Sequence, residues 1–394
     1  MNGIEKVKRF YQDTDHKILL LALCIYLPFL FLGYGSDYDS YNVVWAGKNF
    51  VETLDYVPSR VPGFFIYEFI TFIFNWIGGS ILTNLASVGM SLLILKHFMC
   101  FSKEKQVPHY RLLTLILMVQ PYYLVNSTCT MDYLFAFGFA FLGLMKFRDR
   151  KFFAAGVLMA LGIGSRLTTG LVVAVFYLWV FFTQKEDRGK IILGGVITAC
   201  LTVLFYVPSL DFAEWNFAYV NPSVGTEVFW TPILRIGRFI YKTIYFWSPP
   251  VILVMGWGVL RLIAKRANWT KLPDRSVLFV SAALILVIQS FYLYIPTEPA
   301  YMIPTIPFWL ILMGVAFSDK KSVLTVLLIL VVLSNFVSIN VARPDKVNQA
   351  TGAQYGLWIE PGHLVKDVKK RIEYLNCGNQ PCSLLEADEE MLVE

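Results

Sequence analysis

The chain has 394 residues, of which 56% are hydrophobic and only 16% charged, with a mean hydropathy of +0.57. This composition excludes a soluble globular domain and indicates a polytopic membrane protein. The formal net charge of +6 does not require a nucleic-acid partner. In such a chain the positions of Lys and Arg along the sequence are more informative than their sum, because they predict which loops face the cytoplasm.

The N-terminal segment is polar and basic and leads into a first apolar run, Ile18–Tyr34. The run has no small-residue cleavage site, so we interpret it as a retained first helix rather than a removable signal peptide. The basic residues before it place the N-terminus in the cytoplasm. The stretch that follows, residues 35–63, is then expected outside.

Residues 35–63 form the first long polar interruption of the chain. Asp37 and Asp39 open it, and an amphipathic helix is expected at 40–54, lying at the membrane interface. Ser36 followed by Asp39 is typical of a helix start with a capping box. The stretch ends in Ser59-Arg60-Val61-Pro62-Gly63. Hydrocarbon cannot satisfy such polar groups, so we expect this loop to carry the active site.

The next apolar segment, residues 64–77, is short, contains Glu68 and precedes Gly78-Gly79. We expect a second interfacial or half-inserted helix here, followed by a true span at Ser80–Phe101. Counting 64–77 as a full crossing would place the later basic clusters outside.

The remaining apolar runs predict further crossings with alternating direction. Phe152–Phe182 is interpreted as two short helices that meet near Gly164-Ser165-Arg166. The other expected spans are Leu112–Leu124, Tyr133–Met145, Ile191–Pro208, Val251–Ile263, Val277–Ile295, Met302–Phe317 and Val323–Val341. The sum is an all-α membrane domain over 1–341 with about eleven transmembrane helices, the N-terminus inside and the C-terminus outside.

Residues 342–394 are expected to form a short extracytoplasmic segment. Pro361–Leu375 has the pattern of an amphipathic helix with apolar residues at 364, 365, 368, 372 and 375, and with Lys366, Lys369, Lys370 and Arg371 off that stripe. A bridge between Cys377 and Cys382 is favoured in an oxidising compartment, and two free thiols are the alternative.

Outer-face proton transfer is expected to rest on carboxylates. The four histidines fall on the predicted inner side or in the C-terminal segment. Asp39 is the favoured base, with Asp37 and Asp132 as the other catalytic candidates. The alternative role for all three acids is helix capping and interaction with the helix dipole.

Five basic residues are candidates for binding an anionic phosphate. Arg60 lies near the end of the first outer loop, and Arg166 lies where the two short helices meet. Arg235, Arg238 and Lys242 follow Pro232 on one stripe of an expected helix. The alternatives are a snorkelling arginine for Arg60 and general headgroup contact for the stripe.

Four further residues are expected to bind substrate: Tyr41, Glu68, Glu298 and Tyr301. A Pro-rich turn is the alternative explanation for Glu298. Asn126-Ser127-Thr128 is a glycosylation sequon on the predicted outer side. No Cys/His cluster has zinc-ligand spacing, and we expect no cofactor; Asp37-x-Asp39 is compatible with a divalent cation, but a capped helix start explains it equally.

These motifs resemble those of GT-C membrane glycosyltransferases, a group that includes protein O-mannosyltransferase-like enzymes and the aminoarabinose transferase of lipid A. The similar segments are Asp39-Ser40-Tyr41 with Ala46, Asn49 and Tyr56, then Ser59–Gly63, Asp132 with its Phe-rich helix, Ala155-Gly156 to Arg166, and Tyr301-xx-Pro304-xx-Pro307. The resemblance ends near Phe317.

The resemblance implies inverting sugar transfer from a polyprenyl-phosphate-linked donor to an acceptor hydroxyl on the extracytoplasmic side. The acceptor is a glycan, a lipid or a protein. The loop acid of the family corresponds to Asp39, with Asp37 competing for the role. Many members have an arginine where this chain has Ala300, so Arg235 or Arg238 is expected to substitute for it.

Two alternatives remain open at this stage: a lipid-linked polysaccharide polymerase or ligase, and, in another class, a lipid-linked-sugar flippase or transporter. Transporters tend to show inverted repeats and binding groups at the midplane, whereas the ionisable residues here cluster at the outer ends. The bacterial cytoplasmic membrane is the expected location, or the endoplasmic reticulum membrane for a eukaryotic chain.

Overall fold

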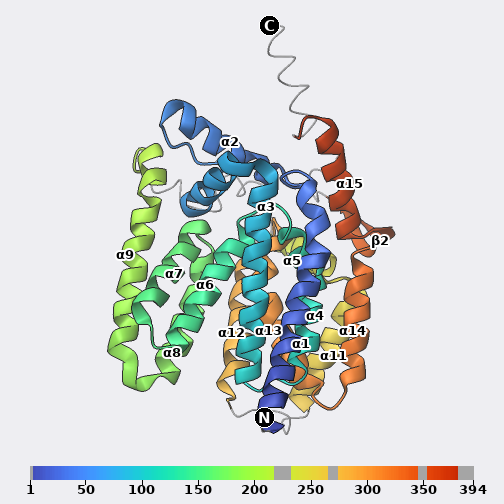
Figure 1. The fold of residues 1–394 in the computed structure, drawn as a ribbon. Helices are drawn as coiled ribbons and strands as arrows, with labels where there is room; N and C mark the ends of the chain where they lie inside the picture. Colours follow the sequence, from blue (N-terminus) through green and yellow to red (C-terminus); the bar gives the residue numbers. More distant parts are fainter. Residues whose placement is uncertain (1–2, 217–231, 265–273, 345–352, 380–394) are drawn as a thin grey trace.

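A computed structural model describes residues 3–216, 232–264, 274–344 and 353–379 of the chain. It is a bundle of helices with a single two-stranded sheet in the described part (Figure 1). α1 begins at one end of the bundle, while α2 and α15 lie at the other, which we call the α2 end.

The first half of the chain contains most of the bundle. Its α-helices are α1 (Gly3–Tyr26), α2 (Tyr38–Thr53), α3 (Phe65–Glu104), α4 (Tyr110–Val119), α5 (Pro121–Asn126), α6 (Tyr133–Arg148), α7 (Phe152–Ser165), α8 (Thr169–Thr183) and α9 (Arg188–Phe212), with short 3-10 helices η1 (Leu27–Phe31) and η2 (Lys185–Asp187). α6 packs on α7, and α7 packs on α9.

The second half adds α10 (Pro232–Trp247), α11 (Pro249–Ala264), α12 (Ser276–Tyr294), η6 (Pro299–Thr305), α13 (Ile306–Ala316), α14 (Lys321–Ser334), β1 (Val337–Pro344), β2 (Ala353–Pro361) and α15 (His363–Asn376). α10 and α11 are bent by 97° at Ser248. β1 and β2 pair antiparallel, with Ile339 opposite Ile359.

This chain is a multi-pass membrane protein. Within the described residues, five helices are long and apolar enough to cross a bilayer, or up to six when the bent pair α10 and α11 counts as one span. Four further apolar helices have 10–17 residues, shorter than the roughly 20 needed for a full crossing. The count of about eleven crossings therefore stays a prediction.

The expected break at Gly78-Gly79 is confirmed. Both glycines have non-helical backbone angles within α3, and Gly79 has φ +57° and ψ −148°. Only glycine adopts that conformation readily, since a Cβ would collide with its own backbone. The break separates residues 65–77 from the long apolar part of α3.

The pair of short helices around Arg166 is also confirmed, as α7 and α8. The helix start at Pro232 is confirmed as well. A proline at the first helical position costs nothing, because its missing N–H would have no partner there.

Two expected spans are wrong in extent. The run 112–124 is interrupted at Gln120, which is extended because Pro121 follows it and disfavours a helical conformation. The span 323–341 ends at Ser334, and the β-branched residues after it form strand β1. There, the Asn335 side chain bonds the carbonyl oxygens of Val119 and Val331.

The C-terminal helix exists, but its buried face differs from the expected one. The residues that face inward are Leu364, Asp367, Arg371 and Tyr374, whereas Ile372 and Leu375 are exposed. Arg371 is fully buried, with Nη2 donating to the Thr128 carbonyl at 2.5 Å and Nη1 to the Phe29 carbonyl at 3.4 Å. The helix thus holds η1 and the segment between α5 and α6, a polar role that an apolar stripe does not predict.

Two smaller expectations concern the same end. Asn126, Ser127 and Thr128 are buried, so the sequon is not accessible for glycosylation in the folded chain. Cys377 is disulfide-bonded, and its expected partner Cys382 lies outside the described residues. The acidic end of the chain also lies outside them.

Candidate active site

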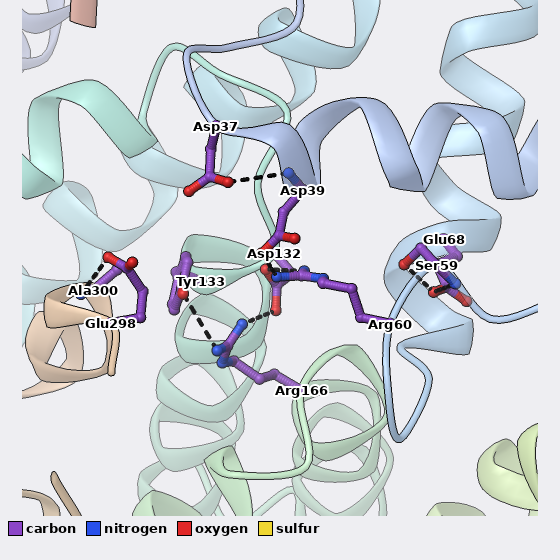
Figure 2. A network of polar contacts seen from close by, with 10 residues as sticks. All are labelled: Asp37, Asp39, Ser59, Arg60, Glu68, Asp132, Tyr133, Arg166, Glu298 and Ala300. Atoms are coloured by element: carbon purple, nitrogen blue, oxygen red, sulfur yellow. Dashed lines mark hydrogen bonds and ion pairs between the residues drawn. The ribbon is translucent and has the colours of Figure 1, made fainter. Parts of the chain in front are cut away.

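The α2 end brings together a chain of alternating charges from four parts of the sequence. Asp39 belongs to the first turn of α2, Arg60 to the loop before α3, Asp132 to the residue before α6, and Arg166 to the α7–α8 junction. Figure 2 shows their side chains converging at one point.

Asp132 is the centre of this network. Its Oδ2 accepts from Arg166 Nη1 at 2.5 Å, and its Oδ1 accepts from Arg60 Nη2 at 3.0 Å. The second nitrogen of Arg60, Nη1, bonds Asp39. The Asp132 side chain is completely buried, so its charge is stable there only because two guanidiniums compensate it. Asp132 is therefore placed to orient the two arginines, and its expected catalytic role stays a prediction.

Aromatic rings hold both guanidiniums from the sides. The Arg166 guanidinium carbon lies 4.0 Å from the Tyr133 ring centroid and 4.6 Å from that of Tyr301. Arg60 lies 4.7 Å from the Phe64 ring centroid. Such stacking fixes the planar groups without using their N–H donors. The buried Nε of Arg60 and the buried Nε of Arg166 have no hydrogen-bond partner within the described residues.

Asp37 is the helix cap, which corrects the expectation that Ser36 caps α2. Asp37 Oδ1 accepts from the backbone N–H of Asp39 at 3.0 Å. The Ser36 hydroxyl instead donates to Asp367 on α15 at 2.5 Å. The cap places Asp39 one residue into the helix, with its carboxylate directed at Arg60.

Asp39 is less buried than Asp132, with 31% of its side chain exposed. Burial raises the pKa of its carboxyl, the Arg60 charge opposes that rise, and the like charges of Asp37 and Asp132 add to it. A carboxylate at the edge of a buried network, with a raised pKa, has the properties of a proton acceptor.

Glu68 lies beside the network and shapes the loop that carries Arg60. One carboxylate oxygen accepts from the Ser59 N–H at 2.9 Å and from the Ser59 hydroxyl, and the other accepts from the Tyr56 hydroxyl. Glu68 is 4% exposed. These bonds position the loop that carries Arg60, and the expected contact of Glu68 with substrate stays a prediction.

Tyr41 packs among aromatic rings. Its ring makes edge contacts with Tyr34 and Tyr374, and its hydroxyl donates to the Gly35 carbonyl at 3.2 Å. It thus joins α2 to α15.

Glu298 and Tyr301 come from η6 and the residue before it. Glu298 caps η6 by accepting from the Ala300 N–H at 3.4 Å, and it lies near the network in Figure 2. Burial and the neighbouring Asp37 raise the pKa of Glu298 to about 7, and Lys242 opposes the rise. Tyr301, in the same 3-10 helix, stacks on Arg166 as described above. A small cavity of about 20 Å³ lies between Arg166, Tyr133 and Tyr301.

Three cationic residues of α10 were expected to bind phosphate, and they are only partly connected to the network around Asp132. Lys242 is in electrostatic reach of Glu298, whereas Arg235 lies 5.1 Å from the Tyr294 ring centroid. Arg238 lies on the same helix, close enough to affect Lys242 and Tyr292. The sequence did not single out Phe64 and Tyr133, and it marked Ser59 and Tyr56 only as parts of motifs without a role of their own. Their position in the sequence could have indicated a role in the site, because each of the four lies within four residues of Arg60 or Asp132 along the chain.

Solved structures with a similar fold exist for this bundle of apolar helices with a polar cluster at one end, and they confirm the fold that the GT-C resemblance predicted. Two crystal structures of ArnT from Cupriavidus metallidurans are similar to it. The apo structure has a TM-score of 0.55 at 17% identity, covering 79% of this chain and 60% of that one. The structure bound to undecaprenyl phosphate has a TM-score of 0.53 at 17% identity, covering 77% and 59%.

This chain thus spans about 60% of the length of the ArnT chains it matches. No family model matches its sequence, and no curated protein matches it significantly.

Proposed function

We propose that this protein is a glycosyltransferase that moves a sugar from a polyprenyl-phosphate donor to an acceptor hydroxyl. The observation that carries the proposal is the network Asp39–Arg60–Asp132–Arg166. It combines one accessible carboxylate with two rigid guanidiniums, on a fold shared with a protein crystallised with undecaprenyl phosphate.

The guanidiniums supply the electrostatic part of the reaction. As the bond between the sugar and the phosphate breaks, negative charge grows on the phosphate oxygens. Arg60 and Arg166 stabilise that charge in a partly dry site, where their orientation is already fixed by Asp132 and by the stacked rings. The two carboxylates and two guanidiniums of the network compensate one another, so a donor phosphate competes with Asp39 for Arg60.

Asp39 supplies the base. When the phosphate engages Arg60, the Asp39 carboxylate loses its ion-pair partner and accepts the proton of the acceptor hydroxyl as that oxygen attacks the anomeric carbon. Attack from the side opposite the phosphate inverts the configuration of the sugar. Arg235 and Arg238 extend the cationic surface toward the lipid phosphate, and the reaction takes place on the extracytoplasmic side.

The test is a pair of isosteric variants, Asp39→Asn and Asp37→Asn. Asn has nearly the same size as Asp and caps a helix about as well at position 37, so folding is expected to survive in both. Loss of the base is expected to slow transfer by roughly 10²–10⁴-fold in Asp39→Asn, whereas Asp37→Asn stays within about fivefold of the parent because its loss costs only ~0.3–1 kcal/mol of dipole interaction.

The measurement is release of polyprenyl phosphate from a labelled polyprenyl-phosphate hexose, in detergent with membrane extract as acceptor source. Thermal unfolding of each variant controls for folding. Parent-like activity of Asp39→Asn removes Asp39 as the base, and a dead Asp37→Asn beside it transfers the role to Asp37.

A further inference from the structure

Another cavity lies at the α2 end, between α10 and the antiparallel pair of β1 and β2 with α15. We call it the hairpin cavity. Its volume is about 230 Å³, and it is lined by Tyr241, Lys242, Tyr245, Asn340, Val341, Glu360 and Lys366. These residues come from α10, β1, β2 and α15, so only the folded C-terminal segment creates the cavity. None of its residues from β1, β2 or α15 belongs to the network around Asp132.

The polar groups of the cavity wall are held in place by one another. Glu360 Oε2 accepts from Asn340 Nδ2 at 2.8 Å and from Lys366 Nζ at 2.5 Å. The Ser338 hydroxyl donates to Asn340 Oδ1 at 2.9 Å, and Asn340 is 4% exposed. Lys366 Nζ also lies 5.5 Å from the Tyr245 ring centroid. The wall therefore presents a carboxylate, an amide and an ammonium in fixed positions beside two tyrosine rings.

The ammonium groups of the wall have acids near them. Lys366 is bound to Glu360, and the charge of Glu298 acts on Lys242 against the like charge of Arg238. A phosphate would require uncompensated cations, so this wall does not suit one. A neutral, hydroxyl-rich ring is suited to it, because hydroxyls both donate and accept, and the aromatic faces cover the C–H surface.

Size leads to the same class of ligand. Water occupies about 30 Å³ per molecule in the liquid, so the cavity has room for several waters or for one ring of monosaccharide size. Lys242 connects it to the reacting centre, because this side chain both lines the cavity and acts on Glu298, which caps the helix that carries Tyr301.

We propose that the hairpin cavity binds a neutral sugar ring of the acceptor, which makes the acceptor a glycan. The statement that the bound sugar belongs to the acceptor rests on the proposed function. The statement that this cavity binds a sugar does not rest on it. The donor sugar must lie at the phosphate-binding arginines, and the hairpin cavity is a separate place lined by other residues.

The experiment measures sugar binding and lipid binding separately. Saturation-transfer NMR on the purified chain uses glucose, galactose, mannose and N-acetylglucosamine as probes. At least one is expected to bind, with about tenfold weaker apparent affinity in Asn340→Ala and in Lys366→Gln, since each loses a hydrogen-bonding group of the wall. Lys369→Ala, an exposed neighbour on α15, is the matched control and is expected to bind like the parent.

Undecaprenyl phosphate binding, followed by thermal stabilisation, is the second arm. Loss of sugar binding with lipid binding intact in the cavity variants supports the inference. Failure of every probe sugar to bind the parent, parent-like binding by both variants, or displacement of the sugar by inorganic phosphate overturns it. If the sugar binds and the lipid does not, the cavity stands and the proposed function falls.

Discussion

Asp39 has neighbours of both signs, and their balance makes its titration testable. The base must be ionised to act, so activity falls as the pH drops through the pKa of Asp39. Since burial raises that pKa and Asp37 adds to the rise, the acid limb is expected above the ordinary value of 3.8.

Removing the charge of Asp37 is therefore expected to lower the pKa of Asp39. In Asp37→Asn the acid limb should move to lower pH, because a like charge that disfavours ionisation is gone. The measurement is the pH dependence of kcat/KM for transfer, made in a Glu298→Gln background. That background is needed because Glu298 has a pKa of about 7 and also responds to Asp37. An unchanged or upward-shifted limb contradicts the assignment.

The Asp39 carboxyl makes folding stability depend on pH, in the opposite direction from a salt-bridged surface acid. A carboxyl whose pKa is raised in the folded state contributes stability below its unfolded pKa and loses that contribution as the pH rises through the folded pKa. Asp39 thus makes the site slightly less stable in the ionised form that the proposed reaction would use. This is the pattern expected where function, rather than folding, selects a residue.

At the scale of an element, the break in α3 is the feature that positions Arg60. Residues 65–77 of α3 carry Glu68, and Glu68 holds the Ser59–Arg60 loop. The direction of this segment is set at Gly78-Gly79, and the backbone angles of Gly79 are ones that other residues adopt only with strain.

Gly79→Ala is expected to destabilise the fold by about 1–3 kcal/mol, because Gly79 has φ +57°. It is also expected to lower transfer activity, since Glu68 and Arg60 shift with the segment. Gly89→Ala is the matched control in the same helix: it has helical angles and open space around its Cβ, so it should be neutral or stabilising by up to ~1 kcal/mol. Thermal unfolding of both variants tests this prediction. Equal melting temperatures would show that position 79 does not require glycine.

Local sequence patterns predicted where the helices and their breaks lie better than they predicted which face of a helix is buried. Helix periodicity found α2, α10 and α15, and glycine pairs and prolines marked the breaks in α3 and before α10. Periodicity failed at α15 because its inner face is polar: Arg371 and Asp367 are buried against loop carbonyls and Ser36, which no hydrophobic stripe reveals. It failed again at β1, whose β-branched residues continue the apolar run of α14.

For the whole molecule, the site was predicted as a set of residue types but not as a network. Asp39, Arg60, Asp132 and Arg166 were each candidates, yet the pairing of Arg60 with Asp132 joins residues 72 positions apart. Such pairing depends on how α3, α6 and α7 pack, which one sequence does not specify. The hairpin cavity was missed for the same reason, because α10 and β1 lie about 100 positions apart in the chain.

The orientation of the bundle in the membrane is the remaining whole-molecule prediction. Basic loops place the connection between α8 and α9 in the cytoplasm and α15 outside, and the two lie at opposite ends of the bundle in Figure 1. Single cysteines replace exposed lysines at the two ends, Lys369→Cys on α15 and Lys185→Cys in η2. The background has Cys24, Cys100 and Cys200 replaced by Ala, because these three thiols are exposed in the described structure.

A membrane-impermeant maleimide applied to intact cells is expected to label Lys369→Cys and not Lys185→Cys, whereas both label after lysis. The reason is the direction of α1: a basic N-terminal segment kept in the cytoplasm makes Ile18 and the residues after it cross outward, which brings α2 and its Asp39 to the outer face. The reverse labelling pattern would place Asp39 and the arginines on the cytoplasmic side. Donors for the proposed transfer would then have to present their phosphate from that side, and the extracytoplasmic reaction would have to be abandoned while the network and its chemistry remained.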